Sequence, residues 1–466
     1  MDTPVCLVAD IGTSSIKAGI IDCRGNLAAS SRVEIPYVDN RFDTLHPREL
    51  IQAFRSAVLQ LPNRDRISAI AVSGNGPTLI PINSDGDDLG CVLMWLDKRE
   101  KRIENTRSFF LPKAAWLRQN QPDVFSQTRT MLSCAEYLQY YLTDELHTAS
   151  PSDEFDGLFW AQDDLESYRI QAHLFPPFLR PGETIAPLQN GLAESLGLPA
   201  GAPCIAAGSD FLMSLLGTAT VEPGLICDRA GSSEGINYCS AQELHDSRLR
   251  TLPHVIPGYY NVAGILSSTG LLFEWFRRFA GMQDMSYAAM LDMIARSKQP
   301  VPWFFPTLHT GASWEFHHGM FYGLGADHGA AEMGRAVVES IGFAVRETVD
   351  ILAAALGDVQ VMRACGGQAR NVIWNQMKAD MAGVAIEVPQ VPEAELMGNA
   401  ICCFVALGEY STLSEAAGQM VKIAARYTPD TSTYQLYSEE YRKYSQAYQA
   451  MRRAVISEDT VQQRFQ

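Results

Sequence analysis

The sequence lacks the glycine-rich phosphate-binding motifs of two common nucleotide-binding folds. It contains no G-x-x-x-x-G-K-[ST] motif, and no glycine is followed by lysine. The nearest approach to G-x-G-x-x-G is Gly74-Asn75-Gly76, which has no third glycine. Both motifs need glycine at fixed places so that backbone N–H groups can approach the phosphates. Neither a P-loop nor a Rossmann site is therefore expected.

Paired cysteines are also missing. Ten cysteines are present, but none forms a C-x-x-C pair, and most stand in apolar runs. Disulfide frameworks and zinc sites need clustered or regularly spaced thiols, so buried and reduced cysteines are expected. The first residues, Met1–Pro4, have none of the basic residues that open a signal peptide. Together these features predict a cytoplasmic protein.

Charged residues and long apolar runs are scarce. Charged residues make up 19% of the chain, and the formal net charge of −16 opposes nucleic acid or an anionic membrane as a partner. No segment approaches the roughly 20 apolar residues of a membrane span. With 466 residues, 47% of them hydrophobic, the chain can bury a large core. Its length predicts two domains or more.

Strand and helix patterns alternate along the first half. Apolar runs at 5–9 and 16–21, separated by a Gly/Ser/Thr turn, predict a hairpin. Helical spacing follows at 49–61, and strands are predicted at 67–72, at 79–82 and in a segment leading into Trp95. Such alternation is typical of the α/β class.

A related pattern returns about 220 residues later. Arg229–Ser233 repeats the Gly-hydroxyl turn of Asp10–Ser14 between two short apolar strands. Repetition on this scale indicates a duplicated domain rather than a solenoid. We place the boundary near residue 243, which gives domains 1–243 and 244–466. The second half also carries helical patterns, at 332–356, 374–382, 400–407 and 434–455.

The two turns and two aspartates are the candidate chemistry. Glycine lets backbone N–H groups converge on an anion, so Gly12-Thr13-Ser14 and Gly231-Ser232-Ser233 could clamp a polyphosphate. Asp10 and Asp210 are each predicted to end a strand, where a carboxylate can hold Mg²⁺ or accept a proton. Taken singly, each turn also fits an ordinary hairpin, and each aspartate a helix cap or turn former.

Five segments, in order along the chain, resemble the motifs of one enzyme family. These are Val8–Lys17, Leu93–Arg99, Lys113–Pro122, Gly319–Glu339 and Gly366–Asp380. They are similar to the opening phosphate motif, the W-x-D-x-R segment, the two signatures and the adenosine motif of the FGGY carbohydrate kinases. By this resemblance the chain is identified as a member of that family, and it is expected to be similar to the xylulokinases.

This resemblance implies a fold and a set of roles. The fold would be two RNase H-like, actin-like ATPase lobes enclosing an interdomain cleft. The first lobe would hold the sugar and the catalytic Asp210, and the second would hold the adenine nucleotide. The implied cofactors are ATP and Mg²⁺, with Asp10 placing the metal.

Further residues take roles by the same resemblance. The ATP-binding residues would be Gly12, Thr13, Ser14, Gly231, Ser232, Ser233, Gly366, Gly367, Gln368 and Asn371. The substrate-binding residues would be Asn75, Gly76, Trp95, Asp97 and Asp210.

One departure leaves the substrate open. Where xylulokinases usually carry Met-His and glycerol kinases Arg-Glu, this chain has Gly76-Pro77. A pentulose such as xylulose or ribulose is the expected acceptor. A tetritol, a deoxy-sugar or a signalling carbohydrate is the alternative, as is a nucleotide-binding sensor or ATPase of the same superfold without kinase activity. A homodimer is left open.

Overall fold

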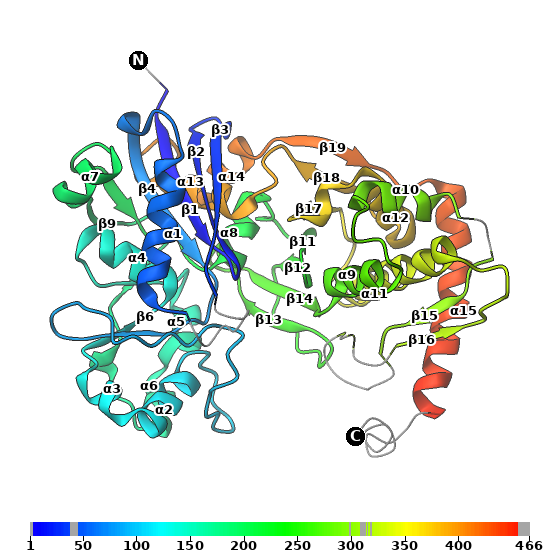
Figure 1. Ribbon diagram of the computed structural model, residues 1–466, viewed down its shortest axis with the longest axis horizontal. Helices are drawn as coiled ribbons and strands as arrows, with labels where there is room; N and C mark the ends of the chain where they lie inside the picture. Colours follow the sequence, from blue (N-terminus) through cyan, green and yellow to red (C-terminus); the bar gives the residue numbers. More distant parts are fainter. Residues whose placement is uncertain are drawn as a thin grey trace. The chain divides into compact units, whose positions relative to one another are not determined.

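The chain folds into two compact units, each built around its own β-sheet (Figure 1). The computed structural model describes residues 3–37, 45–297, 300–307, 314, 316 and 319–454. The first unit comprises Met1–Val221, Pro253–Gly258 and Glu393–Lys422, and the second comprises Glu222–Leu252, Tyr259–Pro392 and Ile423–Gln466. The first crossing between units thus falls at Val221–Glu222 instead of the predicted residue 243.

The sheet of the first unit has six strands in the order β3-β2-β1-β4-β10-β9. Strand β1 pairs antiparallel with β2 and parallel with β4, which in turn pairs parallel with β10. The strands are β1 (Val5–Ile11), β2 (Ser15–Asp22), β3 (Leu27–Glu34), β4 (Ile67–Gly74), β9 (Thr184–Pro187) and β10 (Pro203–Ile205). The predicted hairpin at the start of the chain is confirmed as β1–β2.

Alternate residues of β1 face opposite layers of helices, as the two-residue period of a strand requires. Leu7, Ala9 and Ile11 join a core with α1 and α4. Helix α13 packs on the same sheet strands, and its Asn399 side chain donates to the Ala9 carbonyl at 2.7 Å. The helices of this unit are α1 (Pro47–Leu59), α2 (Leu111–Asn120), α3 (Pro122–Gln127), α4 (Cys134–Thr143), α5 (Asp153–Trp160), α6 (Gln162–Tyr168), α7 (Asn190–Leu196), α8 (Asp210–Gly217), α13 (Ala394–Ala406) and α14 (Leu413–Met420).

The second unit repeats the strand order of the first. Its sheet runs β13-β14-β12-β11-β17-β18-β19, so the hairpin β11–β12 with parallel β17 corresponds to β1–β2 with parallel β4. The duplication predicted from the two Gly-hydroxyl turns therefore appears in the topology. The strands are β11 (Leu225–Ala230), β12 (Glu234–Ser240), β13 (Arg250–Pro253), β14 (Tyr260–Leu266), β17 (Val361–Cys365), β18 (Ile386–Pro389) and β19 (Ile423–Tyr427).

Helices α11, α12 and α15 pack together in this unit. The predicted helix at 332–356 is confirmed as α11 (Ala330–Leu356), which ends at Gly357 with φ +103°. Helix α12 (Val372–Ala382) matches its prediction, and α15 (Thr431–Ala454) matches except at Val455, which lies outside the described residues. The remaining helices are α9 (Thr269–Phe279) and α10 (Tyr287–Ala295), with a two-stranded sheet of β15 (Trp303–Phe305) and β16 (Met320–Tyr322).

Three local predictions are wrong. Leu93 makes only an isolated bridge with Leu79, so no strand leads into Trp95. Asp210 does not end a strand, because β10 stops at Ile205 and Asp210 is the first residue of α8. An acidic side chain in the first turn of a helix is favoured by the helix dipole. Helix α13 begins at Ala394, six residues before the predicted start at Ala400.

All ten cysteines are free, and nine of them are buried, Cys23 being the exception. This confirms the prediction of reduced, buried thiols. Among the helices that the structure describes, none is both long and apolar enough to cross a bilayer.

Candidate functional site

The first Gly-hydroxyl turn, Gly12–Ser14, joins β1 to β2 and is held from several sides. The N–H of Gly12 donates to the Ser15 carbonyl at 3.0 Å. A Cβ added at Gly12 would stand 3.1 Å from that same oxygen, so the turn is built for glycine. The Trp95 indole donates to the Thr13 hydroxyl at 3.0 Å, and the Tyr37 hydroxyl donates to the Thr13 carbonyl. The turn is therefore fixed before any ligand binds.

Asp10 lies just before this turn and is only 3% exposed. Its Oδ1 accepts a hydrogen bond from the Ser73 hydroxyl at 2.7 Å, and Asn399 donates to that hydroxyl at 2.9 Å. Burial, followed by the negative charges of Glu395 and Asp210, raises the pKa of Asp10 to about 7. The Asp10 carboxyl is therefore surrounded by more negative than positive charge.

Asp210 and Glu395 are the two acids whose charges act on Asp10. The hydroxyl of Ser214, one turn along α8 from Asp210, lies 2.9 Å from the Asp210 carbonyl oxygen and 3.2 Å from Glu395 Oε1, and it can donate to either. The backbone N–H of Phe211 donates to Asp210 Oδ1 at 2.7 Å. Glu395 was missed from the sequence because the helical pattern was taken to start at Ala400. The acidic segment Glu393-Ala394-Glu395 was the signal that could have found it.

The donor set fits a hard cation that keeps most of its own waters. The carboxylates of Glu395 and Asp210 both act on Asp10, and the positive charge of Lys17 opposes them there. Carboxylate oxygens are the ligands that Mg²⁺ prefers, usually with water and phosphate oxygens completing its shell. Across the described part of the chain, no three His, Cys, Asp or Glu residues converge closely enough to cage a metal. A metal here would therefore need oxygens from a phosphate or water.

The predicted sugar residues have different surroundings. Asn75 is buried, its Nδ2 donating to the Ile11 carbonyl at 3.1 Å and its Oδ1 accepting from Thr78 at 2.8 Å. A side chain at Gly76 would meet the Cβ of Ser209 at 3.9 Å, so Gly76 lies next to the start of α8. Asn75 therefore supports the loop, and Gly76 brings the loop close to Asp210.

Asp97 is held by a cluster of basic residues, while Trp95 is exposed. The Arg99 guanidinium donates to Asp97 at 2.8 Å and lies over the Trp116 ring, and the buried Lys113 donates to the Asp97 carbonyl at 2.7 Å. Trp95 is 40% exposed. Of these two predicted sugar residues, Trp95 is the more exposed.

The second turn, Gly231–Ser233, lies in the second unit and is held as firmly as the first. Gln368 donates from its amide to the Gly231 carbonyl at 2.7 Å, and the N–H of Leu271 donates to the Ser232 carbonyl at 3.1 Å. A Cβ added at Gly270 would come within 2.2 Å of the Gly231 carbonyl oxygen. Only glycine at 270 allows the start of α9 to lie against this turn.

The adenosine motif meets the same turn. Gly366 has φ +86°, and a Cβ there would lie 2.6 Å from the Ala230 carbonyl oxygen. Nothing lies within 4 Å of the space that a side chain at Gly367 would fill. Asn371 caps α12 by accepting from the N–H of Trp374 at 3.0 Å. The structure thus brings Gly366, Gln368 and the second turn together, with Asn371 one short helical turn away.

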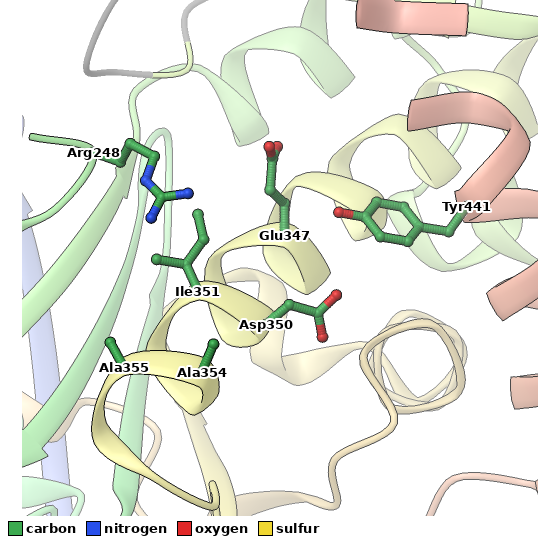
Figure 2. Close-up of a pocket in the computed structure, with 7 residues that line it drawn as sticks. All are labelled: Arg248, Glu347, Asp350, Ile351, Ala354, Ala355 and Tyr441. Carbon is green, nitrogen blue, oxygen red and sulfur yellow. The ribbon is translucent and has the colours of Figure 1, made fainter. Parts of the chain in front are cut away.

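A pocket of about 350 Å³ in the second unit contains none of the predicted residues (Figure 2). Two of its charged groups already face protein partners, since Arg248 pairs with Asp246 at 2.6 Å and Asp350 with Arg346 at 3.6 Å. The pocket is lined by Arg248, Glu347, Asp350, Ile351, Ala354, Ala355 and Tyr441. We assign it no role.

Comparison with known proteins agrees with the motif order. The model of the N-terminal domain of the FGGY family of carbohydrate kinases matches residues 5–108 and 105–217, and that of the C-terminal domain matches residues 229–407. A xylulose kinase of Staphylococcus epidermidis is 23% identical over 95% of this chain and 96% of its own length. An autoinducer-2 kinase of Escherichia coli K12 is 23% identical over 95% of this chain and 94% of its own length.

Solved structures share the fold. The ligand-bound xylulose kinase from Lactobacillus acidophilus superposes with a TM-score of 0.82 at 22% identity, covering 96% of this chain and 98% of that one. A gluconate kinase from the same organism gives 0.83 at 22% identity, covering 97% and 99%. The fold is thus the actin-like ATPase fold predicted from the sequence. The chain belongs to the FGGY family of carbohydrate kinases, enzymes that use ATP to phosphorylate sugar hydroxyls.

Proposed function

We propose that the chain uses Mg²⁺ and ATP to phosphorylate a hydroxyl of a pentulose such as xylulose or ribulose. The observation that carries this proposal is the grouping of Asp210 with Asp10 and Glu395 in the first unit, where Gly76 adjoins the start of α8. The end-to-end similarity to proteins named xylulose kinase supports this class of acceptor.

Asp210 is the proposed base. Phosphoryl transfer needs positioning, neutralisation of charge and one acceptor for the proton of the attacking hydroxyl. Asp210 opens α8 and Ser209 adjoins Gly76, so a hydroxyl of a sugar bound under the Gly76 loop would come within reach of the Asp210 carboxylate. Trp95, with 40% of its surface exposed, would offer the sugar an apolar face.

The nucleotide is assigned to the two turns and the adenosine motif. Thr13, Ser14, Ser232 and Ser233 would donate hydroxyl and backbone hydrogens to the phosphates, with Gly12 and Gly231 allowing close approach. Gly366, Gly367, Gln368 and Asn371 would line the adenosine pocket. Mg²⁺ would neutralise phosphate charge, with Asp10 holding it through water. The proposal also requires that both turns meet one nucleotide in the working enzyme.

The charge around Asp10 favours a neutral acceptor. Asp10, Asp210 and Glu395 outnumber Lys17, so a carboxylate-bearing sugar acid would be repelled. This supports a pentulose over an aldonate. A tetritol, a deoxy-sugar or a signalling carbohydrate is the second candidate, because the autoinducer-2 kinase is also 23% identical and Gly76-Pro77 carries neither an imidazole nor a charge.

The test is an ADP-release screen over pentuloses, hexuloses, polyols and aldonates, with Mg²⁺ and ATP. We expect the highest kcat/KM with a ketopentose and little stimulation by aldonates. ATP hydrolysis that no neutral sugar stimulates would refute the proposal, and a preference for an aldonate would refute the charge argument.

A further inference from the structure

A lysine buried in the second unit is shared by two acids. Lys378 of α12 is 1% exposed, and its Nζ donates to Asp228 Oδ2 at 2.6 Å and to Glu234 Oε1 at 2.5 Å. Both acidic side chains are fully buried. No role assigned above uses these three residues, which we call the buried triad.

The acids of the triad flank the second Gly-hydroxyl turn. Asp228 lies in β11 and Glu234 is the first residue of β12, so the turn Gly231–Ser233 lies between them in sequence. In the ladder, Ala230 pairs with Glu234 and Asp228 pairs with Ile236. Because side chains two residues apart share a face of a strand, Asp228 and Glu234 project from the same face of the hairpin. Lys378 therefore forms hydrogen bonds to both strands of the hairpin, close to the turn.

The triad holds one ammonium and two carboxylates, so it is neutral only when the two acids share a proton. Burial, then the charge of Glu234, raises the pKa of Asp228 to about 8, while Lys378 acts in the opposite direction. Asp228 Oδ1 and Glu234 Oε2 have no hydrogen-bond partner among the described residues. A buried ion pair is seldom more stabilising than apolar side chains of similar volume, so stability alone is a poor reason for this arrangement.

A second link joins α12 to the same turn. The Lys378 ammonium lies 5.2 Å from the centre of the Trp374 ring, one helical turn earlier. The Trp374 indole donates to Gln368 Oε1 at 3.1 Å, and the Gln368 amide donates to the Gly231 carbonyl at 2.7 Å. One face of α12 thus contacts the base of the hairpin directly, through Lys378, and its tip indirectly, through Gln368.

We propose that Lys378 is a positioning residue, which fixes the turn Gly231–Ser233 relative to the adenosine loop Gly366–Asn371. This inference rests on the proposed function, in which the turn binds phosphates and the loop binds adenosine. With the triad intact, both parts of one nucleotide are bound in register. Without it, the turn is free to shift, and phosphate binding weakens more than adenosine binding.

The test compares two variants with the wild-type protein. Lys378→Met leaves two buried acids without a cation and is expected to destabilise the second unit. The triple variant Asp228→Asn, Glu234→Gln, Lys378→Met removes every charge at nearly constant volume and is expected to fold. We expect its Kd for MgADP to rise about tenfold or more, equal to about 1.4 kcal/mol, while its Kd for adenosine and its KM for sugar at saturating ATP change less than threefold.

The outcomes separate this inference from the proposed function. A folded triple variant with wild-type affinity for MgADP would overturn the inference alone. Wild-type protein that binds no MgADP would overturn the proposed function and the inference with it. If the triple variant fails to fold, Glu234→Met takes its place, because it removes the acceptor on β12 and leaves Lys378 paired with Asp228 at balanced charge. Weaker MgADP binding by Glu234→Met, with an unchanged KM for sugar, would then support the inference, and unchanged MgADP binding would overturn it.

Discussion

The indole N–H of Trp95 donates to the hydroxyl of Thr13 at 3.0 Å. This bond joins a residue of the proposed sugar site to a residue of the turn Gly12–Ser14, the two being 82 positions apart in the chain. Since both belong to the first unit, a sugar stacked on Trp95 would directly affect the turn Gly12–Ser14, to which we assign the phosphates.

This bond can be tested with a double-mutant cycle. Trp95→Phe and Thr13→Val should each lower kcat/KM, and the double variant should lose little more than the worse single variant. A net hydrogen bond of this kind is worth about 1 kcal/mol, so the coupling should be of that size. Thr13→Ser, which keeps the hydroxyl, is the control. Strictly additive losses would mean that the bond does not couple the two sites.

Replacing Asp210 should abolish most of the chemistry while leaving the nucleotide bound. Asp210→Asn is expected to lower kcat by about 10²–10⁴-fold, the usual contribution of a positioned base. The Kd for MgADP should change less than about twofold, since the proposed adenosine pocket lies in the second unit. Asp123→Asn is a matched control, because Asp123 is also an acid in the first turn of a helix. Near-normal turnover in Asp210→Asn would exclude Asp210 as the base.

Gly270 should tolerate no side chain. In Gly270→Ala, the new Cβ would lie 2.2 Å from the Gly231 carbonyl oxygen, so the second turn must move. We expect MgADP affinity to fall about tenfold or more, a loss of about 1.4 kcal/mol, measured by calorimetry. Gly157→Ala in α5, where nothing lies within 4 Å of the added Cβ, should keep normal affinity. Equal affinities in the two variants would contradict the close packing described here.

Acid should destabilise the fold through two buried histidines. Burial lowers the pKa of His147 and of His254 to about 4. The unfolded chain takes up protons near pH 6.5 and the folded chain only near pH 4, so each histidine favours unfolding as the pH falls between these values. At pH 5 each contributes about 2 kcal/mol against the folded state.

His147→Gln removes one of these terms and keeps a donor for Gln139, which His147 Nε2 contacts at 2.7 Å. The stability of the variant relative to wild type should therefore improve from pH 7 to pH 5, as measured by denaturant unfolding at each pH. The variant must be compared with wild type at each pH, because burial also raises the pKa of Asp10 and Glu136 to about 7. Those two acids stabilise the folded state as the pH falls, which opposes the effect of the histidines. A difference that does not change with pH would contradict the prediction.

Local patterns predicted the hairpins and the long helix correctly. Strand β1 is an apolar segment and helix α11 is a long amphipathic one, and each is followed by glycine. The residues that identify each element are therefore neighbours in the sequence. The Gly-hydroxyl turns could be found for the same reason. Family resemblance then supplied roles for the turn residues that their spacing alone could not.

Long-range packing decided what the sequence could not show. The sequence places Asp210 after an apolar run, but whether it ends a strand or starts a helix depends on where β10 stops pairing with β4. Glu395 reaches Ser214, and Asn399 reaches Ser73, only because α13 packs on the first sheet, more than 170 positions after Asp210 and Val221. The buried triad is equally hidden, since Lys378 is 150 positions from Asp228.

The placement of Glu393–Lys422 in the first unit has a consequence for synthesis. The chain passes between the two units after Val221, Leu252, Gly258, Pro392 and Lys422. Helix α13, which covers the strands carrying Asp10 and Ser73, therefore leaves the ribosome only after most of the second unit has been made. A fragment cut at residue 221 would expose the apolar face that α13 normally covers, so the enzyme cannot be divided there into two independently stable halves.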